Sequence, residues 1–120
     1  MHIHKTGALI RASVLLGARC GEPLAAESLA HLDRYAKCVG LAFQVVDDVL
    51  DAESDSATLG KTAGKDREAG KPTYVSLMGV ADAKRFAGEL LAQARDALAT
   101  FDGRAARLRE LADFIVKRNR

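Results

Sequence analysis

The sequence predicts an all-α protein that folds as one domain over residues 1–120. Apolar residues make up 48% of the chain, which is ample for one hydrophobic core at this length. Alanine and leucine, which have high helix propensity, are abundant, whereas aromatic residues reach only 5% and tryptophan is absent. Proline, which interrupts helices, occurs only at Pro23 and Pro72.

Apolar residues at helical spacing define the predicted elements. The predicted helices span, in chain order, residues 3–17, 22–53, 72–79, 81–101 and 105–117. Gly17 and Pro23 are the stop signals for the first helix, and Pro72 is acceptable at the start of the third. A break near Gly40 in the long second helix remains an alternative.

The segment from residue 57 to residue 72 has a different composition. Each of three glycines is followed directly by a lysine, namely Lys61, Lys65 and Lys71. Glycine favours irregular backbone, so we expect a flexible loop with positive charge.

Charge and hydropathy exclude several classes of protein. The net charge is +2 with 28% charged residues, which is typical of an ordinary protein surface and lacks the strong positive charge of a nucleic-acid-binding protein. No apolar run reaches the ~18 residues of a membrane span, and no signal peptide is visible, so we expect a cytoplasmic protein. Cys20 and Cys38 lack the spacing of a metal or redox motif and are expected to be free thiols.

The stretch FQVVDDVLD, residues 43–51, places three carboxylates among apolar residues. At ~100° per residue, one narrow stripe of the helix carries all the polar positions and one glycine. They are Lys37, Gly40, Gln44, Asp47, Asp48 and Asp51. The other positions are apolar, so this stripe is expected to face a cavity or a groove.

Neighbouring carboxylates repel one another, and a hard divalent cation such as Mg²⁺ is their best neutraliser. We expect Asp47 and Asp51 to share the ion, Asp48 to hold its hydration shell, and Gly40 to leave space for a substrate. A solvated acidic face that pairs with lysines of a neighbouring helix remains the alternative. An EF-hand loop is excluded because Ser56 stands at its glycine position, and a P-loop because no strand precedes Lys61.

Four blocks occur in order: HKTGALI at 4–10, GLAFQVVDDVLD at 40–51, LGKTAGKD at 59–66 and GKPTYVSLMG at 70–79. Together they resemble the C-terminal half of the trans-polyprenyl diphosphate synthases, and bacterial farnesyl diphosphate synthases most closely. The resemblance implies the C-terminal part of an isoprenoid synthase helical bundle, which works as a homodimer. It also implies condensation of an allylic diphosphate, dimethylallyl or geranyl, with isopentenyl diphosphate to give farnesyl diphosphate and release diphosphate.

The resemblance implies a Mg²⁺ site and a diphosphate clamp. Asp47, Asp48 and Asp51 match the second aspartate-rich motif of that family, in which Asp47 and Asp51 would serve a Mg²⁺ ion. Lys61 matches the lysine that clamps the diphosphate, and Lys71 is similar to a second cationic loop residue. Both lysines could instead be solvated loop charges.

The remaining implied roles concern the substrates. Lys5 and Thr6 match the lysine–threonine pair beside the allylic diphosphate, although Lys5 could be a plain surface lysine. Gln44 matches a polar wall residue near the reacting carbons, and Phe43 a cavity-lining aromatic or simply a core residue. The basic tail, Lys117, Arg118 and Arg120, resembles the C-terminal segment of the family that closes over the isopentenyl diphosphate site. The alternative is that this tail is a frayed, charged chain end.

The sequence departs from the family pattern because it holds one aspartate-rich motif where the family has two. We therefore expect half a site, no meaningful activity of the chain alone, and a missing N-terminal half as partner. Apolar faces left exposed in this way favour a homo-oligomer.

A non-catalytic dimerisation or regulatory module that retains the motif is the alternative function. A class I terpene cyclase is disfavoured by the GKT and GKPTY segments, and product length stays undetermined.

Overall fold

The structure, a computed structural model, describes residues 3–20, 23–57, 72–101 and 103–118, and these form helices, turns and short connections without a strand. Its elements are α1 (Ile3–Arg19), α2 (Ala26–Ala57), α4 (Tyr74–Met78), α5 (Val80–Ala97), a 3₁₀ turn η1 (Gly103–Ala105) and α6 (Ala106–Lys117). The all-α prediction is confirmed. Residues 58–71, which contain the predicted cationic loop, lie outside the described residues.

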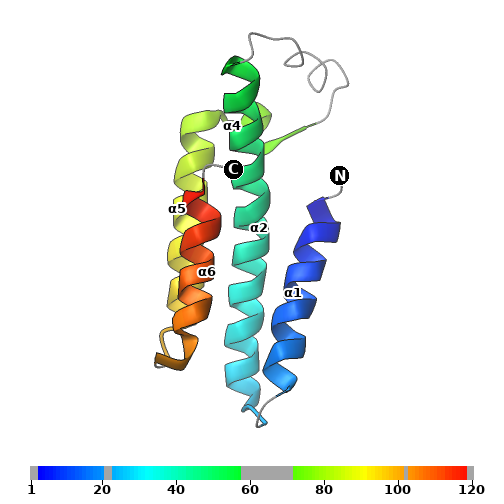
Figure 1. Ribbon diagram of the computed structural model, residues 1–120, viewed down its shortest axis with the longest axis vertical. Coiled ribbons are helices and arrows are strands. Elements are labelled where there is room, and N and C mark those ends of the chain that lie inside the picture. The colour runs from blue at the N-terminus through cyan, green and yellow to red at the C-terminus, as the bar shows by residue number, and fades with distance from the viewer. Residues whose placement is uncertain (1–2, 21–22, 58–71, 102, 119–120) are drawn as a thin grey trace.

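The 32-residue helix α2 is the centre of the fold. Helix α1 lies along one side of α2 and runs antiparallel to it, whereas α5 and α6 cover the other side (Figure 1). The short helix α4 packs on both α2 and α5. Because α1, α4, α5 and α6 all contact α2, residues of α2 face every other α-helix of the described fold.

The core consists of two clusters arranged along α2. One contains Leu32, Tyr35, Val39, Leu98 and Ile115, and the other is built on valines of α2 and alanines of α5. The buried positions of α5 are mostly alanine, and such small side chains allow α5 and α2 to approach closely. The buried face of α5 is Ala83, Ala87, Leu90, Ala94 and Ala97.

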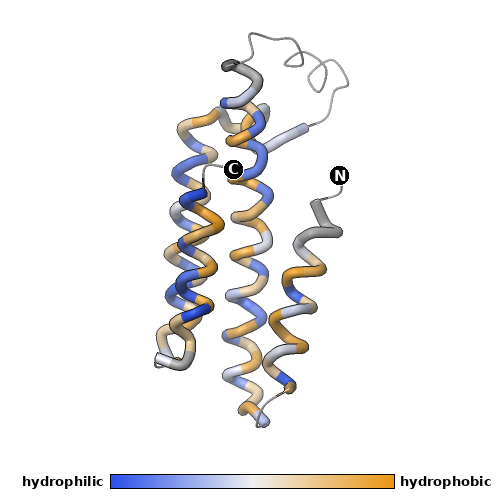
Figure 2. Tube along the Cα trace, viewed as in Figure 1, coloured by the Kyte–Doolittle hydropathy of each residue, from blue (hydrophilic) through white to orange (hydrophobic). Residues whose placement is uncertain are grey.

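Helix α1 is apolar on two sides. Hydrophobic residues make up much of its length (Figure 2). Ile10, Val14 and Ala18 pack against the core, while Leu9 and Leu16 are 67% and 68% exposed. A helix that is apolar beyond its buried face is typical of one that has a further contact surface.

The two helices α1 and α2 are in close backbone contact at a pair of glycines. A Cβ atom added to Gly40 would lie 3.1 Å from the Cα atom of Gly7. Helix α2 continues unbroken through Gly40, so the break considered at this position is wrong. The expectation that Gly40 leaves space for a substrate is also wrong, because α1 fills that space.

Helix boundaries differ from the predictions by a few residues. Helix α1 continues past Gly17 to Arg19, because an exposed glycine in the last turn costs a helix only about 1 kcal/mol. Helix α2 begins at Ala26 and not at residue 22. Helix α5 ends at Ala97, where Leu98 donates its backbone N–H to the carbonyl of Arg95 in a tight turn. In the part of the chain that the structure describes, no helix has the length and apolar character needed to cross a membrane.

Candidate active site around the acidic motif of α2

The three aspartates of the motif lie in three different environments on α2. The residue Asp51 is exposed, and the side chain of Asp47 is 23% exposed. Asp48 is buried, with 8% of its surface exposed. The predicted stripe is therefore accessible at Asp47 and Asp51, which lie one helical turn apart, and closed at Asp48.

The carboxylate of Asp48 accepts two hydrogen bonds from the protein. The backbone N–H of Tyr74, the first residue of α4, donates to Oδ2 (2.9 Å), and Nε2 of Gln44 donates to Oδ1 (3.0 Å). Thr73 and Ser76 complete the start of α4 as a capping box, in which each side chain bonds the backbone N–H of the other residue. Asp48 thus joins α2 to α4.

Gln44 is buried, and its amide is only half satisfied. Its nitrogen donates to Asp48, whereas its oxygen, Oε1, has no hydrogen-bond partner within the described residues. A buried acceptor without a donor costs about 1–3 kcal/mol. Such an atom on the motif-bearing helix is a candidate contact for a ligand or for a side chain outside the described set.

Arg118 follows the last residue of α6 and lies against α2. Its Nη2 donates to the carbonyl oxygen of Phe43 (3.2 Å), its Nε to that of Ile115 (3.1 Å), and its Cζ lies 4.4 Å from the centroid of the Phe43 ring. Nη2 is also 3.9 Å from Oδ1 of Asp47. A frayed end is therefore wrong for Arg118, whereas Lys117 is exposed and Arg120 lies outside the described residues.

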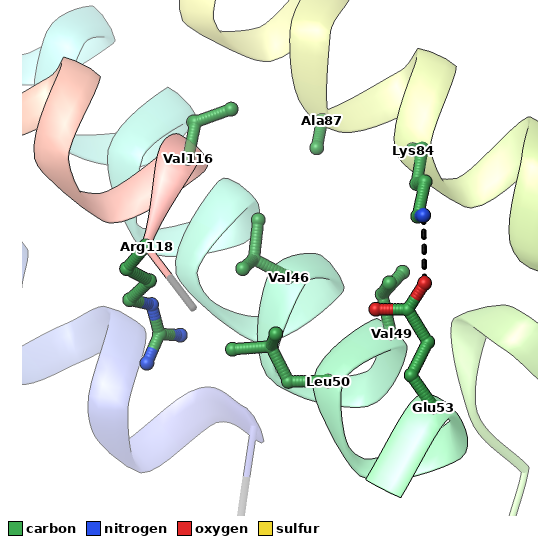
Figure 3. Close-up of a pocket in the computed structure, with 8 residues that line it drawn as sticks. All are labelled: Val46, Val49, Leu50, Glu53, Lys84, Ala87, Val116 and Arg118. Atoms are coloured by element: carbon green, nitrogen blue, oxygen red, sulfur yellow. Dashed lines mark ion pairs between the residues drawn. The ribbon is translucent and has the colours of Figure 1, made fainter. Parts of the chain in front are cut away.

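A pocket of about 290 Å³ opens between α2, α5 and α6 (Figure 3). At its rim Arg118 stands at the end of α6, and Lys84 and Glu53 form an ion pair of 2.7 Å between α5 and α2. Its apolar wall is formed by Val46, Val49, Leu50, Ala87 and Val116. On an α-helix Leu50 is turned only ~60° from Asp47, and Arg118 lies 3.9 Å from Oδ1 of Asp47, so the pocket borders the motif on the side of Asp47.

Lys5 and Thr6 belong to the first turns of α1, next to the glycine contact. Because α1 and α2 are antiparallel, residues that precede Gly7 lie beside residues that follow Gly40, toward Gln44. The side chains of Lys5 and Thr6 are outside the described set, as are residues Lys61 and Lys71. The structure therefore places the backbone of the lysine–threonine pair beside α2 just past Gly40, about two helical turns before Asp47. Lys61 and Lys71 are not placed.

The carboxylates of Asp47 and Asp51 suit a hard cation that takes its remaining ligands from water or phosphate. Among the described residues, no three or more His, Cys, Asp or Glu side chains are grouped so that they could hold a metal ion by themselves. Asp47 and Asp51 offer carboxylate oxygens one turn apart, and Mg²⁺ typically takes one or two carboxylates and keeps water or phosphate oxygens for the rest. Two carboxylates are sufficient for that kind of site but not for a closed protein cage.

Comparison with known proteins identifies the family. The model of the Polyprenyl synthetase family matches residues 1–104. The chain belongs to this family. The chain is 53% identical over 114 residues to a probable farnesyl diphosphate synthase of Sinorhizobium fredii, covering 92% of this chain and 34% of that protein.

Relatives with different products match over similar spans. A mitochondrial geranylgeranyl pyrophosphate synthase 10 of Arabidopsis thaliana is 51% identical, covering 98% of this chain and 34% of that protein. The farnesyl diphosphate synthase of Escherichia coli is 46% identical, covering all of this chain and 41% of that protein. The polyprenyl synthetase chain therefore spans 34–41% of the length of these three relatives.

Proposed function

We propose that the chain supplies the magnesium-diphosphate half of a prenyltransferase site. The complete enzyme would condense dimethylallyl or geranyl diphosphate with isopentenyl diphosphate, giving farnesyl diphosphate and releasing diphosphate. The observation that carries this proposal is the placement of Asp47 and Asp51, accessible and one turn apart on the central helix of a polyprenyl synthetase chain. The matched farnesyl diphosphate synthases support the product, and the geranylgeranyl relatives make its length a matter for experiment.

Each residue has a role that follows from its position. Asp47 and Asp51 would hold Mg²⁺, with Asp48 beside them, and when bound the ion would stabilise negative charge on the leaving diphosphate. Lys5 and Thr6, whose backbone lies beside α2, would bind the allylic diphosphate with Lys61 and Lys71.

The apolar residues and the tail would manage the reacting carbons. Phe43 and the amide oxygen of Gln44 would line the wall beside them, where exclusion of water protects a carbocation from quenching. Arg118, with Lys117 and Arg120, would close the isopentenyl diphosphate site from the C-terminal side.

The first test measures binding, because it needs no complete enzyme. The chain is titrated with inorganic diphosphate in the presence and absence of Mg²⁺ by calorimetry. We expect Mg²⁺-dependent binding that weakens at least about tenfold in Asp47→Asn and in Asp51→Asn, each of which removes an anionic ligand. Asp82→Asn, which removes the same charge at an exposed position on α5, should leave the affinity unchanged.

The second test measures activity. The chain alone, incubated with Mg²⁺, isopentenyl diphosphate and geranyl diphosphate, should give no meaningful product, because one aspartate-rich motif supplies half of the carboxylates. Robust formation of farnesyl diphosphate would contradict this. Supplying the N-terminal part of the Escherichia coli relative in trans should restore turnover, and the chain length of the product then tests the farnesyl assignment.

A second candidate function is a non-catalytic helical module that associates through its apolar faces. The exposed side chains of Leu9, Leu16 and Phe114, which are 67%, 68% and 66% exposed, favour an association surface. Self-association measured by light scattering, without Mg²⁺-dependent diphosphate binding, would support this candidate over the enzyme. Both properties together would support a prenyltransferase part that also forms a homo-oligomer.

A further inference from the structure

We propose that Asp48 is a positioning residue, which orients the Gln44 amide and holds the start of α4, and that it is not a ligand of the cation. The cation part of this inference rests on the proposed function. The positioning part rests on the contacts of Asp48 alone.

The first argument is occupancy. Both carboxylate oxygens of Asp48 already accept a hydrogen bond inside the protein, and the residue is only 8% exposed. Mg²⁺ demands near-octahedral geometry at about 2.1 Å and keeps several waters, which requires open space around the ligand oxygen. Asp47 and Asp51 offer that access, and Asp48 does not.

The second argument is the direction of the Gln44 amide. An ionised carboxylate can only accept hydrogen bonds, so the side of Gln44 that faces Asp48 must be its NH₂ group. The oxygen Oε1 is therefore directed away from Asp48, where it is buried and has no partner among the described side chains. Asp48 thereby fixes an acceptor on α2 for a group that donates a hydrogen bond or carries positive charge.

The third argument is the tether to α4. The N–H of Tyr74 is one of the four N-terminal donors that no helix satisfies internally, and Asp48 accepts it across 26 residues of sequence. The Tyr74 ring packs beside that of Phe86, with centroids 6.1 Å apart. Asp48 therefore fixes the position of the first residue of α4 relative to α2.

Amide hydrogen exchange of the full chain tests the positioning role without any ligand. We expect the Tyr74 amide to exchange at least about tenfold faster in Asp48→Ala, which removes its charged acceptor. In Asp48→Asn one side-chain oxygen still accepts, so the change should stay within about threefold, while the side-chain amide resonance of Gln44 shifts. Asp82→Asn is the control for charge. An unchanged exchange rate of the Tyr74 amide in Asp48→Ala overturns the proposal. If Asp48→Ala does not fold, an unshifted Gln44 side-chain resonance in Asp48→Asn overturns it instead.

Titration with Mn²⁺, followed by paramagnetic broadening, tests the cation part. Asp48→Asn should retain the affinity within about threefold, whereas Asp47→Asn should lose about tenfold or more. Equal losses in the two variants would overturn the assignment of Asp48. If the unaltered chain binds no Mn²⁺, the proposed function fails, and the exchange experiment still decides the role of Asp48.

Discussion

The guanidinium of Arg118 lies over the ring of Phe43, with Cζ 4.4 Å from the ring centroid, and its Nη2 reaches to 3.9 Å from Oδ1 of Asp47. The side chain of Arg118 is only 13% exposed. A permanently charged group is thus held, partly shielded from solvent, beside one of the two accessible carboxylates of the motif.

This position makes Arg118 a competitor of any cation at Asp47. Two positive groups a few ångströms apart repel each other, and partial burial weakens the screening by water. We expect Arg118→Gln to bind Mg²⁺ more tightly, by roughly three- to tenfold, when the chain is titrated with the metal alone. Arg107→Gln removes the same charge from α6, at a side chain that is 92% exposed, and should change little. Weaker binding in Arg118→Gln would contradict the prediction.

The order and type of the helices were predictable because apolar periodicity reports burial directly. The helix around FQVVDDVLD was expected to be apolar on all sides but one stripe, and α2 is contacted by every other α-helix of the described residues. The boundaries were less predictable, since Gly17 looks like a stop signal and yet lies within α1. A local signal of about 1 kcal/mol is easily outweighed by the packing of Ile10, Val14 and Ala18 on the core.

The site was predictable only as far as helical spacing reaches. Spacing places Asp47 and Asp51 on one face, as the structure has them. It does not reveal that Asp48 bonds the backbone of Tyr74, because that contact joins residues 26 apart and involves an N–H group that every residue possesses. The spacing of Thr73 and Ser76, which form a capping box, indicates locally that a helix starts here. It does not indicate that Asp48 of α2 binds this helix start.

The glycine contact between α1 and α2 gives a prediction on stability. Alanine at position 40 would gain helix propensity but would place its Cβ 3.1 Å from the Cα of Gly7, a backbone atom that moves only if α1 moves. We expect Gly40→Ala to lower the free energy of unfolding by about 1–3 kcal/mol, the usual cost of overpacking.

Gly88 is the matched control for this substitution. It lies inside α5 with nothing within 4 Å of an added Cβ, so Gly88→Ala should raise stability by up to about 1 kcal/mol. Urea unfolding of both variants measures the difference. Stabilisation of similar size at both positions would show that α1 and α2 are less closely packed than the structure has them.

Arg109 closes the connection between α5 and α6. Its Nη2 donates to the carbonyl oxygens of Leu98 (2.9 Å) and Phe101 (2.7 Å), which lie just beyond the end of α5. We expect Arg109→Ala to lower the free energy of unfolding by about 2 kcal/mol, because two carbonyls lose a charged donor. Arg107→Ala, two residues away in an exposed ion pair with Glu110, should cost less than about 0.5 kcal/mol by the same urea measurement. Equal losses of stability in the two variants would mean that the hydrogen bonds of Arg109 to Leu98 and Phe101 contribute nothing beyond the loss of one positive charge.

Tyr35 gives the fold a predicted dependence on alkaline pH. It is fully buried, its hydroxyl donates to the carbonyl of Leu108 on α6 (2.7 Å), and burial raises its pKa from 10.0 to about 12. Between these values the unfolded chain loses the phenol proton while the folded chain keeps it. The free energy of unfolding should therefore be unaffected by this group below pH 10 and should fall as pH rises toward 12, by on the order of 2 kcal/mol.

Comparison with Tyr35→Phe isolates this effect, since all other titrating groups are common to the two proteins. At pH 8 the variant should be less stable by about 1 kcal/mol, because the Leu108 carbonyl loses a buried donor. Above pH 10 the unaltered chain loses the contribution of its neutral phenol, so the difference should shrink and then reverse as pH approaches 12. Urea midpoints measured at pH 8, 10 and 11.5 follow the change. A constant difference across that range would mean that the hydroxyl of Tyr35 is accessible to water in the folded protein.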